Sequence, residues 1–234
     1  MIPAMPRPSA SHNGHRQRLR RRFKQASLDS FQDYEILELL LTFSVPRKDT
    51  KAAAKDLLRR HKGLAKVLDA DESELLKTAG IGPRSALLLS LVKQACAAYL
   101  RSRLHRRDIV ESPQAAIDYC RMALAGKTHE VILALFVDTR NRVIADKILF
   151  EGTLDQSAVY PRRIIEEALS LHASGFLLVH NHPSGNPSPS PEDGRLTQSL
   201  LEAAQTLDIR FLDHLIVARG GYHSFREAGF FGKK

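Results

Sequence analysis

The hydrophobic pattern changes character part-way along the chain. Up to a charged stretch at 101–108, apolar residues recur three and four positions apart, as on one face of a helix. From Glu130 onward, short apolar runs of strand length alternate with amphipathic helical stretches. The pattern therefore predicts an α+β chain of two domains, in which an all-α N-terminal domain is followed by a mixed α/β sandwich.

Start and stop signals delimit the predicted helices of the first part. Pro46 ends one helix, Gly63 breaks a second, and Pro83 suits the first turn of a long helix that runs to Tyr99. The predicted elements are helices at 15–24, 33–41 and 51–61, a short apolar piece at 64–68, a pair of helices joined by residues 80–82, and a charged bridge at 101–108.

The second part alternates between strands and helices. Predicted strands lie at 130–138, 143–150, 175–182, 210–217 and 222–225. Predicted helices lie between them at 161–171 and 190–207, and one precedes the first strand, with Ser112 as its N-cap, and runs to about residue 125.

Composition fits a globular protein. The chain has 234 residues, of which 43% are hydrophobic and 26% charged. It lacks an apolar window of about 18 residues, and prolines interrupt the N-terminus where an export signal needs its apolar core, so we expect a cytoplasmic protein. We expect a disordered tail at 1–12, a basic helical domain at 13–107 and a second domain at 112–234. Cys96 and Cys120 lie in apolar helical contexts and are expected to be reduced core residues.

Positive charge is concentrated in the first part. Residues 1–107 hold 22 Lys and Arg against 10 Asp and Glu, a net charge of +12, whereas residues 108–234 hold 13 against 16, a net charge of −3. Six of these cations, including Arg16 and Arg20, fall within residues 15–24. This run is either a solvated helix or basic arm, or a segment that contacts phosphates and releases their counterions. The asymmetry favours a nucleic acid as partner.

A glycine-bounded turn, Gly80-Ile81-Gly82, is a second candidate contact with nucleic acid. Its glycines permit positive φ and close approach of the backbone, and loop amides beside a helix N-terminus can face a phosphate. Lys77 and Arg84 add charge beside the turn. The segment resembles a helix-hairpin-helix module, which binds the DNA backbone with low sequence specificity. The alternative is an ordinary tight turn, in a domain that contacts protein.

The most specific chemical signal is a pair of histidines at the end of a predicted strand. Alternation puts His180 and His182 on one side of the strand and Asn181 on the other. A proline-rich loop separates them from Asp193, a carboxylate at the start of the next helix that could turn back to the histidines. Two histidines and one carboxylate leave the fourth position of a tetrahedral zinc site open. The alternatives are a chance His-x-His and an ordinary capping box between Ser190 and Asp193.

Two further residues supply the groups that hydrolysis needs. Glu130, a carboxylate at the entry of an apolar strand, is the candidate general base, although it could equally be an exposed strand-start residue. Ser190 would lie beside the metal and donate a hydrogen bond to a developing oxyanion. His214 and His223 are expected to be structural or at the surface.

These residues together carry a family resemblance. The order Glu130, His180-Asn181-His182-Pro183, Ser190, Asp193 resembles the JAMM (MPN-positive) metalloprotease signature. A narrower similarity is to the bacterial RadC family. It rests on the string 179–185, the pair at 213–214 and the glycine turn at 220–221 before residues 224–225. Residues 14–16, 34–40 and 46–50 are similar to that family's N-terminal helical domain.

The resemblance has consequences for fold and chemistry. It implies a cytidine-deaminase-like α/β sandwich in which His180, His182 and Asp193 bind one zinc ion per chain. It implies that Glu130 is the acid/base and that Ser190 stabilises the transition state. It also implies a link to DNA repair.

The sequence leaves several functions open. The leading hypothesis is a zinc-dependent metallopeptidase or isopeptidase that the N-terminal domain associates with DNA. The second is a nucleic-acid-binding accessory protein whose zinc site is structural or vestigial. A metal-dependent nuclease is less well supported, because phosphodiester hydrolysis commonly uses two metals bridged by several carboxylates and only Asp193 is evident. A zinc deaminase would need a Pro-Cys-x-x-Cys segment that the sequence lacks.

Overall fold

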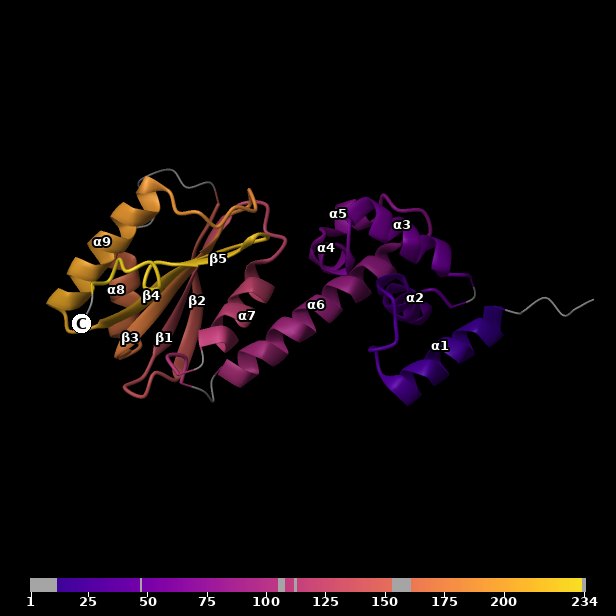
Figure 1. Cartoon of the computed structure of the whole chain (residues 1–234), viewed down its shortest axis with the longest axis horizontal. Helices are drawn as coiled ribbons and strands as arrows, with labels where there is room; N and C mark the ends of the chain where they lie inside the picture. Colours follow the sequence, from indigo (N-terminus) through magenta and orange to yellow (C-terminus); the bar gives the residue numbers. More distant parts are fainter. Residues whose placement is uncertain (1–11, 47, 105–107, 112, 153–160, 233–234) are drawn as a thin grey trace, which may run out of the picture. The chain divides into compact units, whose positions relative to one another are not determined.

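The computed structural model of the chain describes residues 12–46, 48–104, 108–111, 113–152 and 161–232 (Figure 1). The chain divides into two compact units, Met1–Lys93 and Gln94–Lys234, and each has its own apolar core. None of the described helices is both long enough and apolar enough to cross a membrane. The predicted disordered tail falls outside the described residues, except for residue 12, where the first helix begins.

The first unit consists of helices packed around one apolar core. Leu37, Leu41, Leu57 and Leu89 are fully buried in it. These leucines come from three helices, so burial of their apolar faces stabilises the whole unit. The helices are α1 (His12–Ala26), α2 (Asp33–Ser44), α3 (Lys51–His61), α4 (Leu64–Asp69), α5 (Glu72–Leu75) and α6 (Pro83–Leu104), which continues into the second unit. The all-α prediction for this part is confirmed.

Three details of this part differ from the predictions. α6 runs on to Leu104, so the stretch predicted as a charged bridge begins as the last turn of a helix. Its cations at 101 and 103 suit that turn, because they lie at the negative end of the helix dipole. α5 is a single turn, so the segment before Gly80 is shorter than a full helix. Cys96 is exposed, so its prediction as a core residue is wrong, whereas Cys120 is buried. Apolar residues are spread around α6, so its sequence did not show which face is buried.

A hydrogen bond and an ion pair hold α1 against α2. His15 Nε2 lies 2.8 Å from Oε1 of the buried Glu38. Arg22 donates to both carboxylate oxygens of Glu35 at 2.8 Å, and this hydrogen-bonded pair lowers the pKa of Glu35 to about 2. Part of the basic run in α1 is therefore used inside the first unit.

The second unit contains one mixed sheet of five strands in the order β2-β1-β3-β4-β5. β1 pairs antiparallel with β2 and β3, β3 pairs parallel with β4, and β4 pairs antiparallel with β5. The strands are β1 (Glu130–Val137), β2 (Val143–Gly152), β3 (Gly175–Asn181), β4 (Arg210–Ala218) and β5 (Gly221–Ser224). The prediction of helices followed by a mixed α/β part is confirmed.

Helices cover both faces of this sheet. Residues such as Val131 and Leu133 face α7 (Pro113–Leu124), whereas Ile132, Phe136 and Phe176 face α8 (Pro161–Ser170) and α9 (Pro191–Thr206). Figure 1 shows α8 and α9 on one side of the sheet and α7 on the other. β3 lies between β1 and β4 and is buried along its whole length. The polar residues at its C-terminal end are therefore held in a rigid surrounding.

Gly175 begins β3 at a point where β4 comes very close. It pairs with Arg210 in the parallel ladder, and a Cβ at Gly175 would lie 2.6 Å from the backbone oxygen of Arg210. A backbone oxygen cannot move aside without disturbing the ladder. Glycine is therefore required here by the closeness of the strands.

We expect Gly175→Ala to lower the free energy of unfolding by about 1–3 kcal/mol, the usual cost of overpacking, as measured by chemical denaturation. Gly194→Ala in α9 is the matched control, because a Cβ there meets no atom of the described residues within 4 Å. Alanine is favoured over glycine inside a helix by about 0.5–1 kcal/mol, so the control should be at least as stable as wild type. Equal stability of the two variants would contradict the close approach of β3 and β4.

Candidate metal centre

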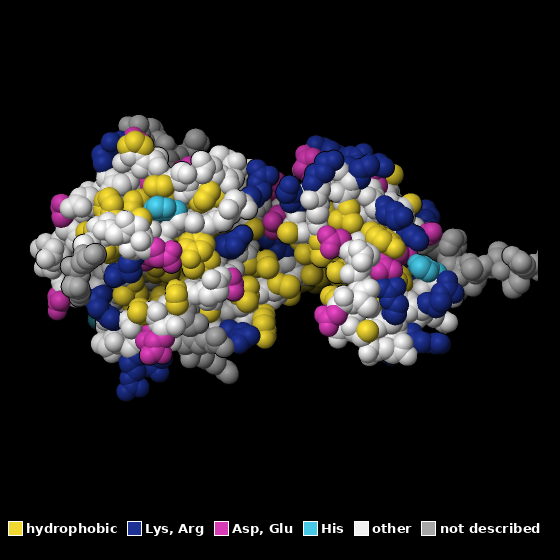
Figure 2. Space-filling view, viewed as in Figure 1, with side chains coloured by type: hydrophobic (Ala, Val, Ile, Leu, Met, Phe, Trp, Pro, Cys, Tyr) yellow, Lys and Arg dark blue, Asp and Glu magenta, His cyan; other side chains and the backbone are white. Residues whose placement is uncertain are grey.

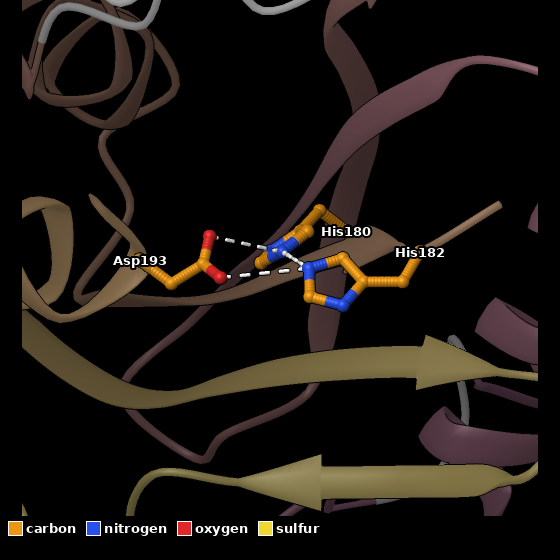
Figure 3. Close-up of side chains that lie close together, drawn as sticks. All are labelled: His180, His182 and Asp193. Carbon is orange, nitrogen blue, oxygen red and sulfur yellow. Dashed lines mark hydrogen bonds and ion pairs between the residues drawn. The ribbon is translucent and has the colours of Figure 1, made fainter. Parts of the chain in front are cut away.

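Three candidate ligand side chains meet at the C-terminal end of β3. His180 lies in β3 and His182 directly follows the strand, so alternation directs both rings to the face covered by α8 and α9. Their Nε2 atoms are 3.0 Å apart. Asp193 Oδ1 lies 3.1 Å from His180 Nε2, and Oδ2 lies 3.5 Å from His182 Nε2. Figure 3 shows the two rings and the carboxylate pointing towards one another.

The start of α9 fixes the Asp193 carboxylate. Ser190 is the N-cap and Pro191 the first residue of the helix, so Asp193 occupies its third position. The amide and the hydroxyl of Ser190 donate to Asp193 Oδ2 at 2.8 Å and 2.7 Å, and the Asp193 amide donates to Ser190 Oγ at 3.1 Å. The capping box considered as an alternative to a metal site is thus present, and the same carboxylate also contacts both histidines.

The charge state of these groups favours a cation between them. Burial alone would raise the pKa of Asp193, but hydrogen bonds from His180 and His182 outweigh it and lower that pKa, so the carboxylate is anionic. The hydrogen bond with Asp193 raises the pKa of His182, burial opposes this, and the charge of Glu130 adds to the increase. The three groups therefore attract a positive charge, either a proton or a metal ion.

The geometry fits a metal ion. His182 Nδ1 lies 2.9 Å from the carbonyl oxygen of Asn186. A carbonyl can only accept, so Nδ1 carries a hydrogen, and Nε2 offers a lone pair to a metal ion whenever it does not donate to Asp193. A tetrahedral ion with bonds of about 2.0–2.1 Å sets its ligand atoms about 3.3–3.4 Å apart. The two Nε2 atoms are 3.0 Å apart, and they lie 3.1 Å and 3.5 Å from different oxygens of the Asp193 carboxylate. His180, His182 and Asp193 can therefore hold a metal ion.

Glu130 lies beside this group on the neighbouring strand. Ile132 pairs with His180 in the antiparallel ladder, so Glu130, two positions earlier, lies level with His182 and on the same side of the sheet. Its charge contributes to the raised pKa of His182. β1 thus brings a second carboxylate to the histidines.

The sequence of the second unit also matches a known family. Residues 110–230, more than half of the chain, match the family model described as the RadC-like JAB domain. The chain belongs to this family. The predicted resemblance to RadC proteins is confirmed, and the matched range contains the whole sheet and the five residues predicted for the metal centre.

The hydroxyl of Ser190 bonds to Asp193, whereas its predicted role requires that it donate to an oxyanion. The role of stabilising an oxyanion needs a free hydroxyl hydrogen, but Ser190 Oγ donates that hydrogen to Asp193 Oδ2. In this RadC-like JAB domain Ser190 therefore orients a candidate ligand. Its contribution to a transition state stays a prediction.

Asn181 has a structural role that the sequence did not indicate. It faces away from the histidines, as predicted, and is buried. Its Oδ1 accepts from the Val131 amide at 2.8 Å, and its Nδ2 donates to the carbonyl of His129 at 3.1 Å. These two bonds hold the backbone on either side of Glu130. The entry of β1 is thereby fixed to the end of β3.

His214 lies behind His180, and the prediction had left open whether it was structural or at the surface. It is fully buried, its Nε2 lies 2.9 Å from His180 Nδ1, and the Phe225 ring stacks on it with centroids 5.0 Å apart. Burial lowers the pKa of His214, and the charge of His180 lowers it further, so its ring is neutral. Only the register of β4 against β3 reveals this contact, because the two histidines are far apart in sequence.

The cations predicted to contact nucleic acid in α1 have internal partners. Arg20 lies over the Phe43 ring, 5.3 Å from its centroid. The Arg16 guanidinium donates to three carbonyls around the end of α2, those of Val45 (2.7 Å), Pro46 (2.8 Å) and Lys48. Arg16 therefore binds the backbone of the segment that follows α2, and its contact with phosphate stays a prediction.

The predicted contacts around the glycine turn are more open. Gly80 has a φ of +84°, so this position uses the conformational freedom expected of glycine. Gly82 directly precedes α6, and Arg84 is exposed in the first turn of that helix. Lys77 is exposed but forms an ion pair with Glu74. Both cations beside the turn are therefore exposed, and within the described parts of the chain Arg84 is the one of the two without an ion pair.

We expect Asn181→Ala to lower the free energy of unfolding by about 1–3 kcal/mol, because it leaves the buried Val131 amide without its acceptor. Gln114→Ala is the matched control, because it removes the side-chain amide of an exposed residue that bonds to Asp118, and it should change stability by no more than about 0.5 kcal/mol. Chemical denaturation at neutral pH compares the two. An equally small loss for Asn181→Ala would contradict the importance of the Val131 bond.

Proposed function

We propose that this chain is a zinc-dependent hydrolase of the metallopeptidase or isopeptidase type. The observation that carries the proposal is the meeting of His180, His182 and Asp193 at separations of 3.0–3.5 Å, with Glu130 level with His182 on the next strand. A catalytic metal site typically has three protein ligands and a carboxylate close to them, and its remaining coordination position is left for water.

The ligand types favour zinc among divalent metals. Imidazole nitrogens and one carboxylate suit a tetrahedral zinc ion, whereas calcium and magnesium prefer sites made of oxygen. Zinc bound by these residues would act as a Lewis acid and lower the pKa of a water molecule to about 7. The membership of the RadC-like JAB family supports a metal-dependent hydrolase fold.

Glu130 would move the protons of the reaction. As general base it takes a proton from the attacking water, and as general acid it passes that proton to the leaving amine. One carboxylate can do both because the two transfers occur one after the other. Ser190 could help the developing oxyanion only if its hydroxyl turned away from Asp193, to which it donates at 2.7 Å.

Nuclease chemistry has less support. Within the described parts of the chain, His180, His182 and Asp193 are the one group of three or more His, Cys, Asp or Glu side chains that could hold a metal ion. Two-metal phosphodiester hydrolysis commonly needs several bridging carboxylates. A single-metal site with one carboxylate ligand fits amide hydrolysis better.

We expect Glu130→Gln to lower kcat by about 10²–10⁴-fold, the usual contribution of general acid–base catalysis, while zinc content stays at the wild-type level. The measurements are turnover of a panel of fluorogenic peptide and isopeptide substrates, and metal analysis of the same preparations. Glu151→Gln on β2 is the matched control, because Glu151 is exposed and pairs with Lys127 and His129.

Either of two results would count against this assignment. A fully active Glu130→Gln protein would remove the role given to Glu130. A wild-type chain that binds zinc but hydrolyses none of the panel would favour the second hypothesis, in which the protein is a nucleic-acid-binding accessory with a structural zinc site.

We further propose that residues 13–107 form a DNA-binding domain of the helix-hairpin-helix type, attached to the hydrolase domain at 112–234. The net charge of +12 over residues 1–107 supports a polyanionic partner. Figure 2 presents a face of the helical unit on which Lys and Arg side chains are numerous and acids are interspersed. The positive φ of Gly80 and the exposed Arg84 support contact with the DNA backbone at the turn.

We expect the full chain to bind duplex DNA with an affinity that falls as salt rises, because phosphate contacts release counterions. Arg84→Ala should weaken binding to different sequences equally and lower the salt slope by about 1. Fluorescence anisotropy with labelled duplexes at several salt concentrations measures both. Arg162→Ala is the control, because this exposed residue of α8 pairs only with its neighbour Glu166 among the described residues. Equal effects of the two variants would contradict the proposed contact.

A further inference from the structure

A chain of three hydrogen bonds runs from His180 back to the helix that carries Asp193. His180 Nδ1 lies 2.9 Å from His214 Nε2. His214 Nδ1 lies 2.7 Å from Thr197 Oγ1, and Thr197 Oγ1 lies 2.6 Å from the backbone oxygen of Asp193. His180, His214 and Thr197 are 1%, 0% and 0% exposed, so water does not compete for these bonds.

The hydrogens in this chain can point in only one direction. Two oxygens 2.6 Å apart need a hydrogen between them, and the carbonyl of Asp193 has none, so the Thr197 hydroxyl donates to it. The hydroxyl has a single hydrogen and must therefore accept from His214 Nδ1. A neutral His214 with its hydrogen on Nδ1 has a lone pair on Nε2, and this lone pair accepts from His180 Nδ1.

We propose that Thr197 and His214 are positioning residues that fix His180 in the form with hydrogen on Nδ1, so that Nε2 is presented to the metal as a lone pair. The proposal deepens the proposed function and rests on its metal site. Metal-bound histidines commonly have their second ring nitrogen held in this way by an outer partner. Here the final acceptor is the backbone of another candidate ligand, so the chain joins both ligands.

The elements around Thr197 and His214 keep this series of hydrogen bonds rigid. Thr197 lies one turn after Asp193 in α9, and His214 lies in β4, the parallel neighbour of β3. The Asp213 carboxylate accepts from the His214 amide at 2.7 Å, and the stacked Phe225 ring restricts rotation of the imidazole. The ring of His214 therefore has a fixed orientation between the two polar contacts.

The test combines nuclear magnetic resonance with zinc titration of the full chain. In ¹⁵N spectra of the side chains, recorded with and without added zinc, His214 should carry its hydrogen on Nδ1 only, and zinc-bound His180 should keep a hydrogen on Nδ1. Thr197→Val removes the hydroxyl at nearly constant shape and should weaken zinc binding about 10–100-fold, as is usual for loss of an outer partner. Competition with a chromophoric chelator measures the affinity.

Two control variants separate positioning from general stability. Thr197→Ser keeps the hydroxyl, so its zinc affinity and its His214 spectrum should equal those of wild type. Thr206→Val removes a threonine of the same helix that bonds in the same way to the carbonyl of Glu202 at 2.9 Å. No bond to an imidazole is found for Thr206 among the described residues, so zinc affinity should not change.

The proposal and the function on which it rests fail in different ways. A hydrogen on Nε2 of His214, or wild-type zinc affinity in Thr197→Val, would overturn the positioning role even if zinc binds. Absence of zinc binding by the wild-type chain would overturn the proposed metal site, and the His214 spectrum without zinc would still decide the hydrogen position. Should Thr197→Val fail to fold, the wild-type spectra still decide the outcome, because a hydrogen on Nε2 of His214 would overturn the positioning role.

Discussion

The candidate site of the second unit depends on the close approach of three polar side chains at the end of β3. The Nε2 atoms of His180 and His182 are 3.0 Å apart and face an anionic carboxylate. Such an arrangement is unfavourable unless a positive charge lies among the groups, and it persists only when each group is held by something rigid. The rigid supports are the fully buried strand β3, the capped start of α9 and the two neighbouring strands.

The supports come from both sides of β3, and each acts through one side chain. Towards β1, Asn181 bonds to the backbone on either side of Glu130. Towards β4, the buried His214 bonds to His180. Polar groups buried at this depth stabilise the fold only when their partners are satisfied, and here each of these bonds also orients a candidate ligand or base. Stability and chemistry are therefore coupled at the end of β3.

The first unit uses its positive charge in two ways. Arg16 and Arg22 contact carbonyls and a carboxylate within the unit, which holds α1 to α2. Arg84 and several cations of α1 and α3 remain exposed. A net charge read from sequence therefore overstates the charge free to meet a polyanion, because part of it is neutralised by internal partners.

The sequence by itself indicated most of the elements and the candidate ligands. Prolines and glycines punctuate the chain strongly, and the predicted strands and helices of the second part lie close to those found. His180, His182 and Asp193 were identified because two-residue spacing on a strand and a helix-start acid are local features. The family resemblance to RadC proteins was also readable from short strings.

Only the tertiary structure decided which distant residues support that site. The pairing of β3 with β4 brings His214 behind His180, and the course of α9 brings Thr197 to His214. The register of β1 against β3 sets Glu130 level with His182 and lets Asn181 fix it. Strand register and hydrogen-bond direction depend on contacts between segments far apart in the chain, and no local pattern of residues encodes them.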